Sequence, residues 1–287
     1  MAALRLAVIT DSHLCPPATP PGFWNHELPL PESWTLWDEA MRVIADSAVD
    51  AIVLLGDVTN FAEPDVMVRA LRRLTDFGKP VMAVAGNHDV APHENALSQA
   101  ARTLGHPLLA VPPFARAVHG FTFAGVPIAA TGTGYRVDDA DCSVPDGLPS
   151  GAPLILLSHF PLIDRRAAIL DQGLRFPGGL DGAVQVTEAL RKRRAPSVVL
   201  HGHLHWQDAT QDGRVLQLGM PALIEWPHAV SVVTMYDDGP GLRIERRTRR
   251  VAAPSGTAAG RFSLNDDRWT VREGRWISAS LEGDGPI

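Results

Sequence analysis

The stretch Ala-Ile-Val-Leu-Leu-Gly-Asp-Val-Thr-Asn, residues 51–60, decides the fold. Its apolar run contains β-branched residues and no charge, which is typical of a strand covered on both faces in a sheet packed between helices. The run ends at Gly56 and Asp57. Because open α/β sheets bind ligands beyond the carboxyl ends of their strands, Asp57 stands where chemistry is expected. Taken alone, it could equally be a turn aspartate, since Gly-Asp often marks loops.

Four other apolar runs in the chain end in the same way, on Asp, Asn or His. The polar segments that follow these runs are Asp11-Ser12-His13, Asn87-His88-Asp89, Ser158-His159 and His203-Leu204-His205. A single ending of this kind is common in turns. Five of them indicate one site assembled from the ends of five strands.

The first third of the chain alternates strands with helices. Apolar spacing predicts helices over 34–47, capped by Ser33, and over 65–77, and each leads into a buried strand. Such alternation indicates a largely parallel sheet with right-handed crossovers. Further helices are expected over 95–104 and 184–194, an antiparallel strand pair over 121–126 and 128–131, and later strands over 215–218, 230–235 and 242–246. The arginines after Ile244, at 246, 247, 249 and 250, are expected at the surface.

Composition excludes several classes of protein. The chain has 287 residues, of which 45% are hydrophobic, and a net charge of −6. The acidic balance argues against a nucleic-acid partner and against anionic membranes, and no apolar run is long enough to span a bilayer. The absence of a basic leader, together with only two cysteines, predicts a cytoplasmic protein.

Two long loops and a C-terminal extension complete the chain. The loops at 14–33, which is rich in proline, and 132–151 are either surface loops or walls of a substrate pocket. Residues 1–251 are expected to form the catalytic domain. Residues 252–260 are interpreted as a linker, and the apolar residues beyond it are expected to pack on the body or on a second subunit, so a homo-oligomer is possible.

Taken together, the five polar segments between residues 11 and 205 resemble the five ordered motifs of the calcineurin-like metallophosphoesterases. The resemblance implies a four-layer α/β/β/α sandwich with two mixed β-sheets and a binuclear metal centre. The segment Gly-Met-Pro-Ala-Leu at 219–223 is similar to the class III cyclic-nucleotide phosphodiesterase branch. Asn60 departs from the family pattern, in which an aspartate often ends the second motif.

The resemblance also implies a role for each residue of the motifs. Asp57 would bridge two metal ions, which could be Mn, Fe, Zn or Co. The other ligands would be Asp11, His13 and His205 for the first metal, and Asn87, His159 and His203 for the second. His88 would stabilise the transition state and protonate the leaving group, with Asp89 orienting its ring. Six further histidines stay outside this scheme.

The leading hypothesis is a phosphodiesterase that acts on a small soluble substrate, such as a cyclic nucleotide or a glycerophosphodiester, by in-line attack of a hydroxide held between the metals. A phosphomonoesterase would use the same metal core. A nuclease is less favoured because the sequence lacks an interleaved basic and aromatic groove. A non-catalytic scaffold of the same fold should have lost ligands, whereas every ligand position here is filled.

Overall fold

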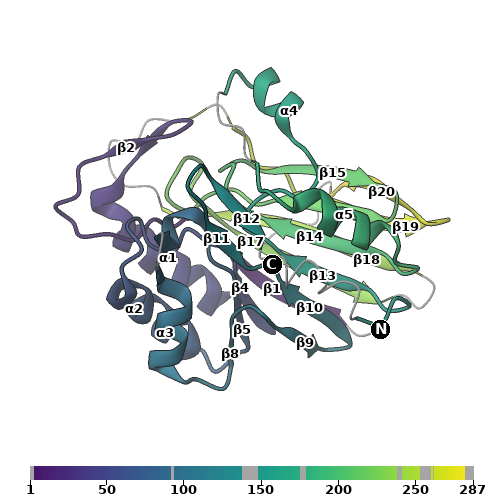
Figure 1. Cartoon of the computed structure of the whole chain (residues 1–287), viewed down its shortest axis with the longest axis horizontal. Coiled ribbons are helices and arrows are strands. Elements are labelled where there is room, and N and C mark those ends of the chain that lie inside the picture. The colour runs from purple at the N-terminus through teal and green to yellow at the C-terminus, as the bar shows by residue number, and fades with distance from the viewer. Residues whose placement is uncertain are drawn as a thin grey trace.

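Two large β-sheets stack face to face and carry helices on their outer sides (Figure 1). The structure is a computed structural model that describes residues 3–91, 94–137, 148–174, 179–237, 241–252, 260 and 262–281. Each sheet mixes parallel and antiparallel strands. The predicted four-layer α/β/β/α sandwich is therefore confirmed.

The first sheet has eight strands in the order β20-β19-β18-β17-β1-β4-β5-β8. Its parallel half contains β1 (Ala3–Ile9), β4 (Ala51–Leu54), β5 (Val81–Ala83) and β8 (Leu109–Ala110). The antiparallel half contains β17 (Ala229–Asp237), β18 (Leu242–Arg250), β19 (Asp267–Arg272) and β20 (Arg275–Ser280). The parallel pairing predicted around residues 51–60 is confirmed, and it places the ends of β1, β4 and β5 at one edge.

The second sheet has six strands in the order β15-β16-β14-β13-β10-β9. Parallel strands β10 (Phe121–Gly125), β13 (Leu154–Leu157), β14 (Ser197–His201) and β16 (Val215–Gly219) lie between antiparallel edges β9 (Ala115–Val118) and β15 (Asp208–Asp212). The predicted pairing of 121–126 with 128–131 is wrong. β11 (Ile128–Ala130) pairs instead with β12 (Tyr135–Val137) in a separate ribbon, because β10 already has partners on both sides.

Four helices lie close to the expected ranges, namely α1 (Ser33–Asp46), α2 (Pro64–Thr75), α3 (Ala96–Leu104) and α5 (Ala183–Arg191), whereas α4 (Arg166–Asp171) was not predicted. Ser33 is the first residue of α1 and not its cap, a position that Glu32 holds. The shorter elements are β2 (Gly22–Phe23), β3 (Glu27–Leu28), β6 (Val90–Ala91), β7 (Glu94–Asn95) and the 3₁₀ turns η1 (Leu30–Glu32) and η2 (Asn87–Asp89).

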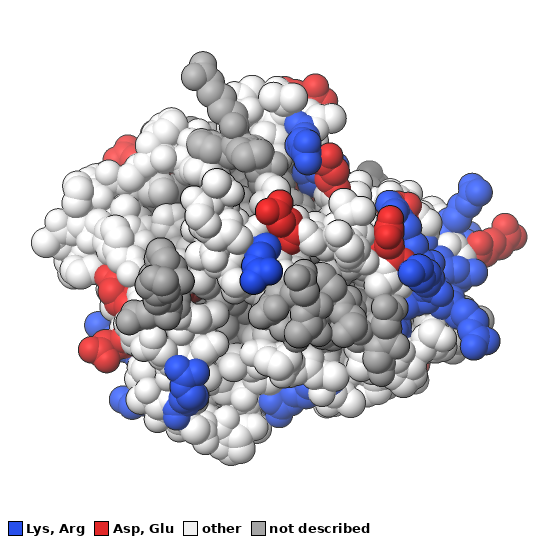
Figure 2. Space-filling model, viewed as in Figure 1, with Lys and Arg blue, Asp and Glu red and all other residues white. Residues whose placement is uncertain are grey.

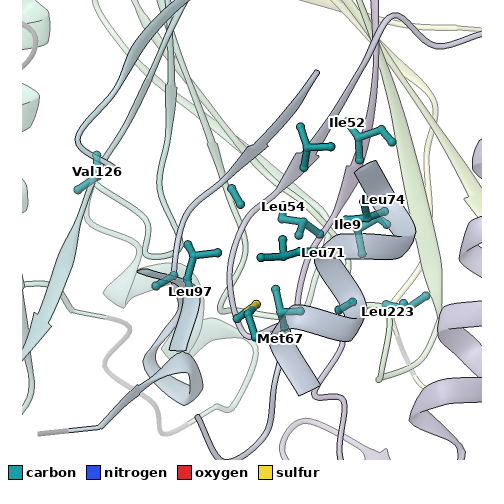
Figure 3. Close-up of a cluster of buried hydrophobic side chains, with 14 of the residues drawn as sticks. Ile9, Ile52, Leu54, Met67, Leu71, Leu74, Leu97, Val126 and Leu223 are labelled. Atoms are coloured by element: carbon teal, nitrogen blue, oxygen red, sulfur yellow. The ribbon is translucent and has the colours of Figure 1, made fainter. Parts of the chain in front are cut away.

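Alternation along the strands divides the interior into an inter-sheet core and a helix-facing core. In β4, Val53 points into the core between the sheets, while Ile52 and Leu54 pack with helix residues. Figure 3 shows the helix-facing side, where Met67, Leu71, Leu74 and Leu97 lie near Ile9, Ile52 and Leu54. Burying one such side chain contributes about 1.5–3 kcal/mol. Since both faces are covered, the strands that carry the polar segments are held firmly in place.

The C-terminal strands extend the first sheet of their own chain. Trp276 is buried, and its Nε1 donates to the Arg214 carbonyl oxygen at 3.0 Å. The prediction that Arg246 lies at the surface is wrong. Its side chain is 1% exposed and pairs with Asp267 of β19, with 2.5 Å between Nη2 and Oδ2. Arg246 Nη1 also donates to the carbonyl oxygens of Asp208 and Gly219, so this side chain lies between β18 and the second sheet.

Among the described residues, no helix is both long and apolar enough to cross a membrane.

Candidate metal centre

Main-chain hydrogen bonds tie the segments after the strands to one another. The Asp11 N–H donates to the Gly56 carbonyl oxygen at 3.0 Å, and the His13 N–H donates to the Asp57 carbonyl oxygen at 2.9 Å. Across the sheets, the His203 N–H donates to the Asp11 carboxylate, at 3.1 Å from Oδ2. Segments almost two hundred residues apart in the sequence are thereby fixed side by side.

The backbone at the site is strained. Five of the seven predicted ligands adopt left-handed backbone conformations, with φ between 45° and 67°: Asp11, His13, Asp57, His203 and His205. For a residue other than glycine, such a conformation costs on the order of 1–3 kcal/mol and persists only where the surroundings impose it. The strained turns direct these five side chains into one cluster, and the surrounding segments hold them there.

Two glycines make room for the carboxylates. A Cβ on Gly86 would lie 2.1 Å from Asp57 Oδ1, and a Cβ on Gly202 would lie 2.6 Å from Asp11 Oδ2. Both separations are far below van der Waals contact. The two motifs need glycine at these positions because the carboxylates occupy the space of a side chain.

The structure brings all seven predicted ligands together. Three groups of ligand atoms lie mutually within 4.8 Å: Asp11, His13 and His205; Asp57, His159 and His203; and His13, Asp57 and His88. Asn87 joins the second group, since its Oδ1 lies 3.0 Å from His159 Nε2. Asp57 belongs to two of the groups, with its Oδ2 3.3 Å from His159 Nε2 and 3.7 Å from His13 Nε2. Asp57 therefore connects the His13 side of the cluster with the His159 side.

Outer hydrogen bonds orient the imidazoles as metal ligands require. The Nδ1 of His159 lies 2.8 Å from the Leu55 carbonyl oxygen, and that of His13 lies 2.9 Å from Asn60 Oδ1. These contacts leave Nε2 of each ring pointing into the cluster, the usual arrangement around a bound metal. The buried His13 Nε2 has no hydrogen-bond partner in the described structure, which fits a nitrogen shaped to hold a cation. Asn60 thus orients the His13 ring from the position where the family often has aspartate.

Glu225 is a site residue that the sequence analysis missed. It is fully buried, and its Oε2 lies 2.7 Å from His205 Nδ1. The same carboxylate accepts a hydrogen bond from the His26 N–H. The available signal was a lone acid within the apolar segment Ala222-Leu-Ile-Glu-Trp, because a buried carboxylate needs partners.

The predicted role of Asp89 is wrong. Its carboxylate accepts hydrogen bonds from the Gly86, Val58 and Thr59 N–H groups, at 3.0, 3.2 and 2.8 Å, and so braces the turn that carries Asp57. The His88 ring is oriented by a different group: its Nδ1 donates to the Asn60 carbonyl oxygen at 3.0 Å. Asp89 points away from His88 because main-chain donors surround it.

The electrostatics of the cluster divide its histidines into two kinds. Burial lowers the pKa of His13 to about 4 and that of His203 to about 3. Burial also opposes charge on His159 and His205, but nearby carboxylates outweigh it. Asp57 raises the pKa of His159 to about 9, and Asp11 with Glu225 raises that of His205 to about 10. In the metal-free cluster at neutral pH, His159 and His205 are therefore protonated and face the carboxylates that raise their pKa.

Metal binding is expected to release protons. A coordinating imidazole must be neutral, so at pH 7 cations would displace the protons of His159 and His205, and apparent metal affinity would rise with pH until about pH 9–10. Titration calorimetry of Mn²⁺ into metal-free protein, in two buffers of different ionisation enthalpy, measures this release. A heat that does not depend on the buffer would contradict the protonated state of both rings.

A cavity of about 290 Å³ opens onto the cluster. It is lined by His13, Gly22, Phe23, Trp24, Leu28, Leu30, Asp57, Asn60, Asn87, His88, His203 and His205. The loop at 14–33 therefore forms one wall of the pocket. From the second long loop, the Tyr135 hydroxyl donates to the Asn87 carbonyl oxygen at 3.2 Å, and residues 138–147 lie outside the described part.

Solved structures share this fold. The chain is similar to a dimetal phosphatase from Danio rerio (TM-score 0.64, 14% identity, covering 86% of this chain and 96% of that one). It is also similar to TT1561 of Thermus thermophilus (0.56, 18%, 87% and 100%) and to the purple acid phosphatase PPD1 of yellow lupin, Lupinus luteus (0.51, 14%, 85% and 51%). A search of curated protein sequences found no match.

Fold and site together define a metal-dependent phosphoester hydrolase. The family described as calcineurin-like phosphoesterase matches residues 4–207, which span all five polar segments. The chain belongs to this family.

Proposed function

We propose that the protein is a phosphodiesterase that acts on small phosphodiesters, such as a cyclic nucleotide or a glycerophosphodiester. The observation that carries the proposal is the charge of the cavity wall. Among the described residues, no Lys or Arg lines the cavity beside the cluster. A phosphomonoester dianion brings more negative charge than a diester monoanion, and binding it without a cationic side chain leaves that charge to the metals alone.

We assign the ligands as the geometry groups them. Asp57 would be shared by two cations, Asp11, His13 and His205 would hold one of them, and Asn87, His159 and His203 would hold the other. Carboxylate, imidazole and amide oxygen suit Mn, Fe, Zn or Co. When bound, two such ions lower the pKa of water to give a nucleophile near neutral pH and offset charge on the phosphoryl oxygens.

His88 is proposed as the proton donor to the leaving oxygen. Its Nδ1–H is held by the Asn60 carbonyl, so its Nε2 is the nitrogen available to the substrate, and the ring lines the cavity. The proton that passes to the leaving oxygen is the Nε2 proton of the doubly protonated ring, which then keeps its Nδ1–H. The His88 N–H also donates to Asp57 Oδ1 at 2.7 Å, which fixes the distance between the donor and the cluster. A held imidazole of this kind suits general acid catalysis.

The diester preference is tested with two chromogenic substrates. Protein reconstituted with Mn²⁺ is expected to turn over bis(p-nitrophenyl) phosphate with a higher kcat/KM than p-nitrophenyl phosphate. The two substrates release the same product, so one absorbance assay compares them directly. A clear preference for the monoester would replace this proposal with a phosphomonoesterase.

A further inference from the structure

We infer that the lip, defined here as residues 22–30, forms a binding site for a flat aromatic group on the substrate. This inference rests on the proposed phosphodiesterase function and narrows its substrate class to diesters in which one ester group carries a ring. The lip supplies five of the residues that line the cavity, namely Gly22, Phe23, Trp24, Leu28 and Leu30.

The lip is close enough to the cluster for one small molecule to contact both. The Trp24 ring centroid lies 6.2 Å from that of His203 and 6.0 Å from that of His205. The cavity volume of about 290 Å³ is at the lower end of the range for ligand pockets. A phosphate at the cluster therefore places its ester substituent against the lip.

The lip is anchored to the body of the protein. Asn25 Nδ2 donates to the Leu204 carbonyl oxygen at 3.0 Å, and the His26 N–H donates to Glu225. Strands β2 and β3 pair with each other, while Leu28 and Leu30 are buried at the base. These contacts hold the lip in position before a ligand arrives. Binding then costs less conformational entropy, because the lip is already ordered.

Phe23 is the part of the lip that favours a ring. Its side chain is 75% exposed, although it borders a cavity whose other apolar residues from the lip are more buried. Figure 2 shows that Lys and Arg gather over α5, β15, β19 and β20, whereas the surface where Figure 1 places β2 is mostly uncharged. A flat ring can cover this apolar surface without losing hydrogen bonds, whereas a polyol would lose its water contacts there.

The ring could be a nucleobase or an aryl alcohol, and the test includes both. Wild-type and Phe23→Ala proteins, loaded with Mn²⁺, are compared on a nucleoside 3′,5′-cyclic phosphate, on bis(p-nitrophenyl) phosphate and on glycerophosphoglycerol. The ratio of variant to wild-type kcat/KM for each substrate cancels its intrinsic reactivity. We expect Phe23→Ala to lower kcat/KM for at least one aromatic diester by about tenfold more than for the aliphatic diester. The loss should come mainly from a higher KM. Its size follows from stacking on an aromatic side chain, which is worth about 1–3 kcal/mol. The aromatic substrate with the larger loss identifies the source of the ring.

Phe61→Ala is the matched control, because Phe61 is also exposed, at 58%, but does not line the cavity. Metal content measured on every protein separates a lost ring contact from a lost cluster. Equal losses on aromatic and aliphatic diesters, or the same selective loss in Phe61→Ala, would overturn the inference and leave the phosphodiesterase proposal standing. If wild-type protein hydrolyses none of the three diesters, the proposed function itself fails.

Discussion

Replacing Asp57 with alanine is expected to empty both metal positions and to lower kcat for phosphoester hydrolysis by roughly 10³-fold or more, since metal catalysis supplies several kcal/mol of transition-state stabilisation. Asp57 is the one carboxylate that lies in two of the three ligand groups found among the described residues. In its absence, no carboxylate lies between His13 and His159. Two cations held by these histidines would then repel each other without a negative charge between them. Elemental analysis after gel filtration gives the metal stoichiometry. A variant that keeps two equivalents of metal per chain would contradict the shared role.

Two further variants make the Asp57 result specific. Asp57→Asn keeps the shape of the side chain and an oxygen that can accept the hydrogen bond from the His88 N–H, so loss of metal in this variant would trace to charge. Asp212→Ala removes a surface carboxylate that pairs with Arg191 and should keep normal metal content and activity. Thermal unfolding of all three proteins in the metal-free state shows whether the fold survives.

Replacing His88 with alanine is expected to separate metal binding from catalysis. The variant should keep both metals, because every proposed ligand remains, while kcat falls by roughly 10²- to 10⁴-fold, the range for removal of a general acid. The loss should be larger for a diester with an alkoxide leaving group than for bis(p-nitrophenyl) phosphate, because p-nitrophenolate is a stable anion that needs less protonation.

The leaving-group comparison is the decisive part of the His88 experiment. An equal loss on both kinds of diester would mean that His88 positions the phosphate and does not donate the proton, and a near-normal kcat would remove it from the mechanism. His119→Asn changes a histidine at the exposed turn between β9 and β10 and should leave metal content and kcat unchanged.

The parallel strands and the ligand cluster could be predicted from sequence because one pattern encodes both. A buried parallel strand leaves a continuous apolar run, and a polar group at its end is conspicuous against that run. Val53 and Leu54 mark β4 in this way, and Asp57 follows at its end. The order of the motifs then predicts which of the two metal positions His203 and His205 each serve. The spacing of these two histidines alone does not decide this.

Contacts between distant segments could not be predicted because no local pattern records them. Glu225 lies in an irregular segment after β16 and meets His205 only through the fold. Asp89 follows His88 in sequence, yet its donors come from the turns at Gly86 and Val58–Thr59. The sequence of β18 predicts a surface position for Arg246, because nothing in it reveals that β19 pairs beside β18 and supplies Asp267.

The buried Glu225 carboxylate contacts a histidine of the metal cluster through one oxygen and the main chain of the lip through the other. A cation bound beside His205 and a molecule seated against the lip would therefore both act on this one carboxylate. Any coupling through Glu225 would be reciprocal: a bound cation would change the affinity for the molecule by the same factor by which the molecule changes the affinity for the cation. The affinities for substrate and metal would in this way depend on each other.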